Sequence, residues 1–163
     1  LGCALPNLQQ LGTVGAQGRD TRGEYGWGLS VVYRSLVPLE ALNLSPGKRV
    51  AGFKWVPADD VPKDAEFAFD HLPLSDQAML ATRAEFAGLR FPPGYIPEKF
   101  TLSQLQELCE QVLGTVLDKS SFRRKLAERH LIEPVEGEFT TGVQNRPAAI
   151  HRLRQRGPRE RIE

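Results

Sequence analysis

The fold is decided by the stretch FTLSQLQELCEQVLGTVLDKSSFRRKLAERH (Phe100–His130). Its apolar positions recur at helical spacing and predict two short amphipathic helices, over Leu102–Leu113 and Asp118–Arg129. Thr101, followed three residues later by Gln104, forms a capping-box pattern, so we expect the first helix to begin there. Only the segment GTVL separates the two helices. Two short helices with so tight a connection are typical of a helix-turn-helix.

The second of these helices is basic, and a hairpin pattern follows it. Residues 118–129 hold five Lys or Arg against Asp118 and Glu128, a net charge of +3. A turn-rich segment, Gly137–Asn145, then leads into a strand that ends in His151–Arg154. A helix, a tight turn, a basic helix and a β-hairpin form the order of a winged helix-turn-helix, whose basic helix enters a DNA major groove.

We expect the DNA contacts to come from the outer face of the second helix and from the wing. Phe122 and Leu126 turn inward, which leaves the basic side chains near the N-terminal end of the helix facing outward. The alternative is a solvated basic helix on a small α/β protein, because charge runs are usually solvated faces. The predicted DNA-binding residues are Lys119, Ser120, Ser121, Arg123, Arg124, Lys125, Asn145 and Arg146.

The composition is that of an ordinary globular protein. Of 163 residues, 40% are hydrophobic and 25% are charged, and no apolar run approaches the ~20 residues that span a bilayer. We therefore expect no membrane partner. Cys3 and Cys109 lack metal-ligand spacing and a disulfide framework is unlikely, so a reducing cytoplasm is the expected location.

Charge is distributed unevenly although the net charge is only +1. Residues 1–100 carry ten basic and eleven acidic side chains, a net charge of −1, whereas residues 144–161 carry six Arg against Glu160, a net charge of +5. Two basic patches beside a near-neutral body are expected of a protein that docks on DNA with one end.

The first part of the chain mixes strands with one helix. We predict an α+β protein with a first domain over residues 1–90, a proline-rich linker over 91–97, a winged helix domain over 98–155 and an arginine-rich tail over 156–163. The expected elements of the first domain are a glycine-dense loop over Thr13–Gly23, strands over Tyr25–Val37 and Val50–Val56, and a helix over Leu74–Leu89 capped by Ser75 or Asp76.

Few residues in this chain point to enzyme chemistry. His71, His130 and His151 lie in different segments without ligand spacing, so we expect neither a metal site nor catalytic residues. Arg19 and Arg22 stand in the glycine-dense loop, where guanidinium groups can bind a diphosphate. The alternative there is an exposed loop with surface ion pairs.

Several motifs occur together in a familiar order. The segment from Phe100 to Pro134, followed by NRPAAIHRLR, resembles the C-terminal winged helix of the Nudix-related transcriptional regulators of NAD metabolism. Upstream, the segment GRDTRG (Gly18–Gly23) before a strand is similar to a Gly-Arg-Asp-x-Arg-Gly segment of that family. The segments WVP (Trp55–Pro57) and FDH (Phe69–His71) resemble the closing part of its Nudix domain. The resemblance extends from about residue 8 to residue 154.

The chain departs from the family at the Nudix signature. The glutamates of that signature hold Mg²⁺, which binds a diphosphate and activates water. This sequence contains none of them, and Leu1-Gly2-Cys3 could be the last three positions of the signature. We therefore expect a truncated Nudix-like α/β domain ahead of the winged helix, and no hydrolase activity from the chain as it stands.

The resemblance implies a DNA-binding repressor of NAD-biosynthesis or salvage genes, located in the bacterial cytoplasm and associated with the nucleoid. Such a protein binds a palindromic operator as a homodimer, requires no cofactor and responds to ADP-ribose or a related nucleotide as its effector. Arg19, Asp20 and Arg22 are the expected effector-binding residues. Two alternatives remain: a Nudix hydrolase of nucleoside-diphosphate sugars with an appended winged helix, inactive as this fragment, and a winged helix that binds proteins.

Overall fold

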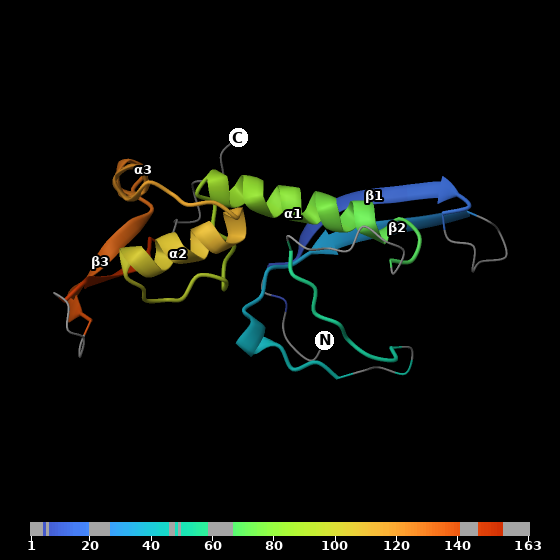
Figure 1. The fold of residues 1–163 in the computed structure, drawn as a ribbon, viewed down its shortest axis with the longest axis horizontal. Helices are drawn as coiled ribbons and strands as arrows, with labels where there is room; N and C mark the ends of the chain where they lie inside the picture. Colours follow the sequence, from blue (N-terminus) through green and yellow to red (C-terminus); the bar gives the residue numbers. More distant parts are fainter. Residues whose placement is uncertain are drawn as a thin grey trace. The chain divides into compact units, whose positions relative to one another are not determined.

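The computed structural model describes residues 5, 7–19, 27–45, 48, 50–58, 67–140 and 147–154. The chain divides into two compact units, Leu1–Tyr95 and Ile96–Glu163. The first contains β1, β2 and α1, and the second contains α2, α3, β3 and β4 (Figure 1). No helix in the described ranges combines the length and apolar character needed to cross a bilayer.

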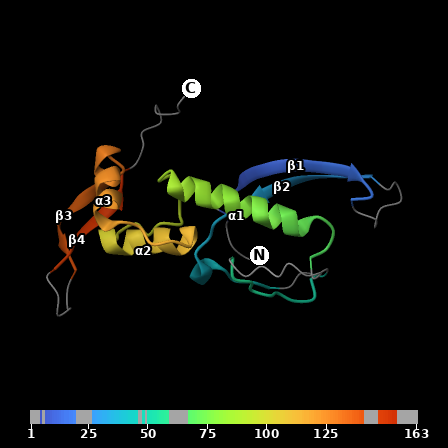
Figure 2. The same cartoon turned by 45° about the horizontal axis from the view of Figure 1, so that its top comes forward.

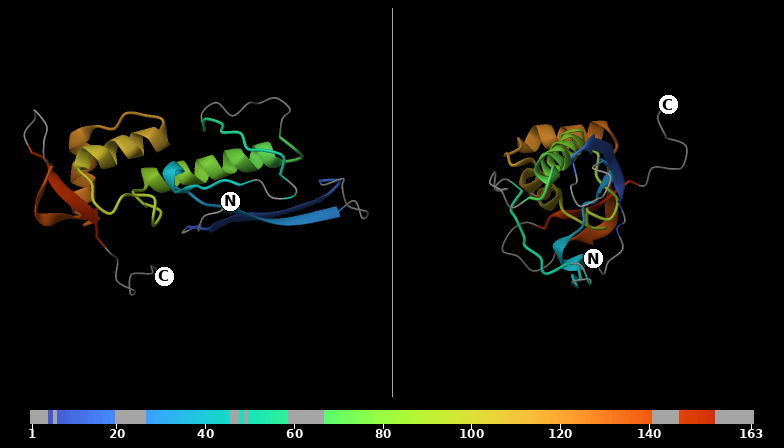
Figure 3. Two further views of the ribbon diagram at one scale, coloured as in Figure 1. Left: turned by 90° about the horizontal axis from the view of Figure 1, so that it is seen from below. Right: turned by 90° about the vertical axis from the view of Figure 1, so that its right-hand side faces the viewer.

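The first unit is built on an antiparallel hairpin of β1 (Gln9–Gln17) and β2 (Trp27–Arg34), which runs beside α1 (Figure 3). The expected loop over Thr13–Gly23 is therefore wrong in its first part. Gly15 belongs to β1, and a Cβ atom there would lie 3.0 Å from Cδ1 of Leu29. The glycine allows large side chains of β2 to lie across β1, which a search for turn residues does not detect.

Helix α1 (His71–Ala87) begins earlier than the sequence predicts. Pro73 lies in the first turn of α1, where its missing N–H has no intrahelical partner to lose, so it does not stop the helix. The prediction that Ser75 or Asp76 caps the helix is wrong, because the cap position is Asp70, whose side chain makes no capping hydrogen bond.

Two further elements of the first unit differ from the prediction. The segment Val50–Val56 forms no strand, and its apolar residues Phe53 and Trp55 are exposed. A strand requires a hydrogen-bonded neighbour, and none of the strands described in this structure pairs with this segment. β2 ends at Arg34, so residues 35–37 lie beyond the strand that was expected to continue to Val37.

The faces of β2 are unusual for a protein hairpin. Leu29, Val31 and Tyr33 are exposed on one face, together with Trp27. Arg34, on the other face, donates to Thr82 Oγ1 at 2.9 Å and pairs with Glu85 at 2.8 Å. Polar contacts therefore join β2 to α1. The apolar packing of α1 is at its C-terminal end, where Phe86 meets the rings of Phe91 and Tyr95 edge-on.

The second unit combines crossing helices with a hairpin (Figure 2). Helices α2 (Leu102–Leu113) and α3 (Lys119–Glu128) precede β3 (Ile132–Phe139) and β4 (Ala149–Leu153), which pair antiparallel. Phe100 adds a single bridge to His151, so a third segment joins the edge of β4. The buried apolar side chains of this unit are Ile96, Phe100, Leu105, Cys109, Phe122 and Leu126.

Candidate nucleic-acid interface

The start of α2 is fixed by the capping box predicted from the sequence. The N–H of Thr101 donates to Gln104 Oε1 at 2.8 Å, and the N–H of Gln104 donates to Thr101 Oγ1 at 3.2 Å. Each side chain thus satisfies one of the backbone donors that a helix leaves free at its N-terminus. The helix consequently starts at the residue after Thr101, as expected.

The turn between the helices is held by backbone conformation and by side chains. Gly114 ends α2 with a φ of 69°, in the left-handed region that glycine adopts readily. Glu110 Oε1 accepts from the N–H of Leu117 at 2.8 Å, and Gln106 Nε2 donates to the carbonyl of Leu117 at 2.9 Å. Asp118 then caps α3, accepting from the N–H of Ser121 at 2.8 Å. Sequence analysis missed the contacts of Gln106 and Glu110.

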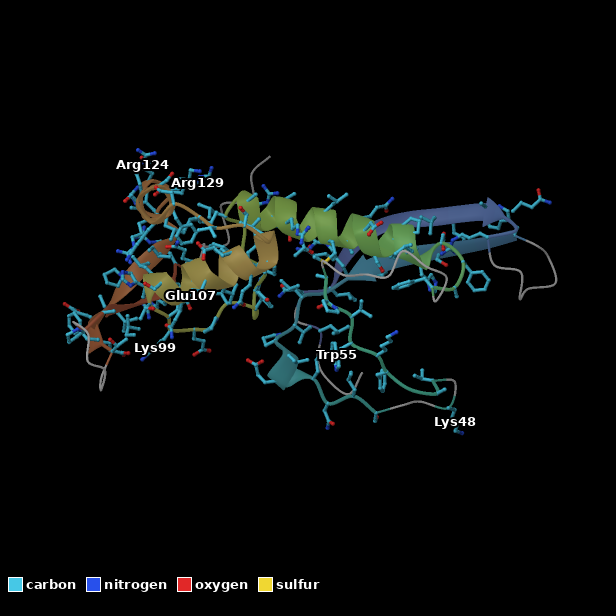
Figure 4. All side chains as sticks on the ribbon, viewed as in Figure 1. Lys48, Trp55, Lys99, Glu107, Arg124 and Arg129 are labelled. Carbon is cyan, nitrogen blue, oxygen red and sulfur yellow. The ribbon has the colours of Figure 1, made fainter. Side chains whose placement is uncertain are left out.

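Helix α3 carries the predicted DNA-contacting side chains, but they are not equally exposed. Arg123 is half-buried, and its Nε is a buried atom without a hydrogen bond within the described part of the chain. Arg124 makes a long, exposed ion pair with Glu128 at 3.7 Å, which contributes little. Arg124 and Arg129 extend outward from α3 (Figure 4). Ser121 is half-buried, and the exposed members of the predicted set on this helix are Lys119, Ser120, Arg124 and Lys125.

The wing begins later than predicted. Gly137, expected in the wing loop, lies within β3, and the strand continues to Phe139. The remaining part of the expected wing includes Asn145 and Arg146, which lie outside the described residues. At the base of the hairpin, Glu133 pairs with Arg152 at 2.6 Å and with Arg154 at 3.6 Å. These arginines of the C-terminal basic segment are thus positioned by β3.

The predicted effector-binding residues are only partly described. Asp20 and Arg22 lie outside the described residues. Arg19 is 10% exposed, pairs through Nε with Asp70 and donates through Nη1 to Ser30 at 2.8 Å. The hydrogen bond from Arg19 holds the pKa of Asp70 below its usual value. Arg19 is therefore hydrogen-bonded to the residue that precedes α1. The sequence does not predict this pair, because Asp70 is 51 positions away from Arg19.

The described ranges contain three histidines, each in a different segment. Within them, the structure brings together no group of three or more His, Cys, Asp and Glu side chains that could hold a metal ion. His71 packs edge-on against Phe69, and the Nδ1 of His151 lies 3.1 Å from the carbonyl of Ala149.

Comparison with known families identifies the second unit. Residues 94–153 match the family of NrtR DNA-binding winged helix domains. Over these residues the chain is similar to a winged helix domain of the NrtR type. The match covers α2, α3 and the β3–β4 hairpin, and it confirms the winged helix that the sequence predicts.

Longer relatives match most of the chain. The chain is 30% identical, over 152 residues, to the ADPR responsive transcriptional repressor NtrR of Acinetobacter baylyi, covering 93% of this chain and 58% of that protein. The crystal structure of Shewanella oneidensis NrtR is similar with a TM-score of 0.66 and 32% identity, covering 92% of this chain and 65% of that one. Shewanella oneidensis NrtR complexed with a 27mer DNA matches with the same TM-score and identity, covering 91% and 65%.

These comparisons confirm the resemblance to the Nudix-related regulators. The chain spans less than two thirds of the length of the relatives, so their activities and ligands belong to longer proteins. The NrtR-type domain is nevertheless matched over its helices and its hairpin.

Proposed function

We propose that this chain is part of a DNA-binding transcriptional repressor of NAD-biosynthesis genes whose operator affinity is controlled by ADP-ribose. One observation carries the proposal: α3 presents Lys119, Arg124 and Lys125 to solvent in an NrtR-type winged helix domain. The Acinetobacter relative is named as an ADPR responsive repressor, and the Shewanella relative has been solved with DNA. Exposed cations on a helix that enters the major groove contact phosphates and base edges.

The proposed DNA-binding surface consists of α3 and the wing. We assign phosphate contacts to Lys119, Lys125 and Arg124, because all three are exposed on α3 and the ion pair of Arg124 with Glu128 is long. Arg123, which is half-buried with its Nε inside, is held in a narrower set of positions and is better suited to a base edge. The full proposed set is Lys119, Ser120, Ser121, Arg123, Arg124 and Lys125 on α3, with Asn145 and Arg146 from the wing.

The proposed regulator is a homodimer on a palindromic operator, with the two recognition helices in successive major grooves. The proposed effector-sensing domain comprises residues 1–90, and a linker over residues 91–97 joins it to the winged helix domain. Arg19, Asp20 and Arg22 are proposed to bind the effector, because the segment GRDTRG that contains them resembles a segment of the Nudix-related regulators. ADP-ribose would favour a state with misplaced recognition helices and so lower operator affinity.

Binding of the full-length protein to a labelled promoter of an NAD-biosynthesis operon tests the proposal. We expect affinity to fall with salt and to fall further when ADP-ribose is added. Lys119→Ala and Arg124→Ala should each weaken binding and lower the slope of log K against log salt by about one. Lys48→Ala, which removes an exposed charge from the first unit, is the control.

Three outcomes would contradict parts of the proposal. If both α3 variants bind DNA with the affinity and the salt slope of the wild type, α3 does not belong to the DNA interface. No binding of DNA at any salt concentration, with turnover of a nucleoside-diphosphate sugar instead, would favour the hydrolase. Binding of DNA that ADP-ribose leaves unchanged would retain the repressor and remove its proposed effector.

A further inference from the structure

Two side chains of α2 converge on the backbone of a single residue in the turn. Glu110 accepts from the N–H of Leu117, and Gln106 donates to the carbonyl of the same residue. Gln106 Nε2 also donates to Glu110 Oε1 at 2.9 Å, so the two side chains support one another. We call Gln106, Glu110 and the backbone of Leu117 the turn clamp. Gln106 and Glu110 belong to α2, and Leu117 lies in the turn that joins α2 to α3 (Figure 1), immediately before the cap residue Asp118.

The turn clamp replaces hydrogen bonds that the turn cannot make for itself. Leu117 is half-buried between two helices, so its N–H and C=O lose water without gaining a ladder partner. A carboxylate is a strong acceptor for the N–H, and the amide of Gln106 is a donor for the C=O. These donors, the Gln106 amide first and the Leu117 N–H second, keep the pKa of Glu110 below its usual value. The clamp therefore carries a charged acceptor at neutral pH.

We propose that Gln106 and Glu110 are positioning residues for DNA sequence recognition. They hold Leu117, and thereby Asp118 and the start of α3, at one place relative to α2. Neither side chain needs to touch DNA for this role. The inference rests on the proposed DNA-binding function and adds to it the residues that determine how accurately α3 is presented.

Accurate placement matters more for base contacts than for phosphate contacts. A bidentate contact with a base edge requires both atoms to meet within hydrogen-bond distance, whereas a flexible lysine reaches a phosphate from several positions. Loosening the start of α3 should therefore weaken operator binding while leaving binding to random DNA nearly unchanged. A cap alone does not supply this placement, because Asp118 and Ser121 both belong to the α3 end and move together with it.

The test is the ratio of the Kd for random DNA to the Kd for operator DNA, measured on the full-length protein. We expect Glu110→Ala to lower this ratio about tenfold, the loss of one good base contact. Gln106→Ala should lower it less, because the N–H of Leu117 keeps its acceptor. Glu110→Gln retains an acceptor oxygen and should stay close to the wild type.

Glu107→Ala and Gln111→Ala are matched controls on the same helix. Both residues are exposed, and neither belongs to the turn clamp (Figure 4 labels Glu107). Glu107→Ala removes the same charge as Glu110→Ala, so any general gain in DNA affinity from lost repulsion appears in both variants. We expect the specificity ratio of both controls to equal that of the wild type.

Hydrogen exchange gives a readout that does not depend on DNA. The amide of Leu117 should lose protection in Glu110→Ala and keep it in Glu110→Gln, while the amides of the buried helix core remain protected. If Glu110→Ala fails to fold, Gln106→Ala carries the test, since it leaves the carboxylate in place.

The proposal is overturned if Glu110→Ala has the same specificity ratio as Glu107→Ala, or if Glu110→Gln is as impaired as Glu110→Ala. An equal loss of affinity for operator and random DNA in a variant that still folds would also overturn it, because the turn clamp would then have no particular effect on base contacts. A wild-type protein that does not distinguish operator from random DNA would instead contradict the proposed function itself.

Discussion

His130 ends α3 in a backbone conformation that favours glycine. Its φ is 51°, and the N–H groups of His130 and Leu131 reach back to Ala127 and Leu126 at 3.0 and 3.1 Å. These bonds close the helix in the Schellman arrangement, whose left-handed position is usually glycine. His130 is exposed, so its ring contributes little packing that would offset the strain.

We therefore expect His130→Gly to stabilise the protein by about 0.5–1 kcal/mol, as the relief of strain exceeds the added freedom of the unfolded chain. Urea unfolding followed by circular dichroism measures the change. His130→Ala, which keeps a Cβ, is the control and should give no gain. A glycine variant less stable than the wild type would show that the imidazole makes a stabilising contact.

Cys109 makes the stability of the winged helix depend on pH in the alkaline range. Its side chain is fully buried, and burial raises the pKa of the thiol from 9.0 to about 12, with a smaller contribution from the Glu110 charge. The folded state thus holds the neutral thiol. Its stabilisation is complete below the unfolded pKa of 9.0 and is lost as pH rises toward about 12.

Thermal unfolding of the wild type and Cys109→Ala at pH about 8 and about 10 checks this expectation. The wild type should lose more stability over that interval than the variant, because alanine does not titrate. Subtracting the loss of stability of Cys109→Ala from that of the wild type removes the contributions of lysine and tyrosine, which both proteins share. Equal losses in both proteins would mean that the thiol ionises in the folded state as readily as in the unfolded chain.

Among the elements, α3 depends on a single side-chain cap. Asp118 accepts from the N–H of Ser121, and its replacement by alanine should cost about 1 kcal/mol of folding free energy. Asp118→Asn keeps an acceptor and should cost much less. Asp76→Ala is a control in α1, because Asp76 lies inside that helix and does not cap it. Denaturant unfolding measures all three, and equal costs at the two positions would contradict the role of the cap.

Helices were predicted more accurately than strands because their signals are local. Thr101 and Asp118 each bond to a residue three positions away, so α2 and α3 could be located from the sequence alone. The alternating pattern of Val50–Val56 resembles a strand, but a strand also needs a partner that local sequence does not specify. The glycine-dense sequence around Gly15 predicts a loop, but Gly15 lies in β1 and allows the side chains of β2 to approach closely.

The candidate site shows the same division. The basic residues of α3 could be predicted from charge and helical spacing, because a helix face follows directly from sequence order. The contacts of Gln106 and Glu110 with Leu117 could not, because they join side chains to the backbone across a turn. The pair of Arg19 and Asp70 connects distant segments, and no sequence pattern marks it.

At the scale of the whole molecule, the two units differ in how they are held together. The second unit buries Leu105, Cys109 and Leu126 almost completely, around a core shared by both of its helices. In the first unit, polar contacts of Arg34 with Thr82 and Glu85 join β2 to α1, and the side chains of Trp27 and Trp55 are 60% and 63% exposed.

Because of this uneven placement of aromatic residues, intrinsic tryptophan fluorescence reports on one of the two units. Both tryptophans belong to the first unit, and residues 96–163 contain neither tryptophan nor tyrosine. Emission excited at a wavelength that tryptophan alone absorbs therefore originates, in this chain, only from the part proposed to sense the effector. If effector and operator binding are reciprocally coupled, operator DNA that is bound by α3 should change this emission without touching either indole. If DNA binding saturates, as measured by the anisotropy of the labelled DNA, while the tryptophan emission stays constant, the two units are not coupled.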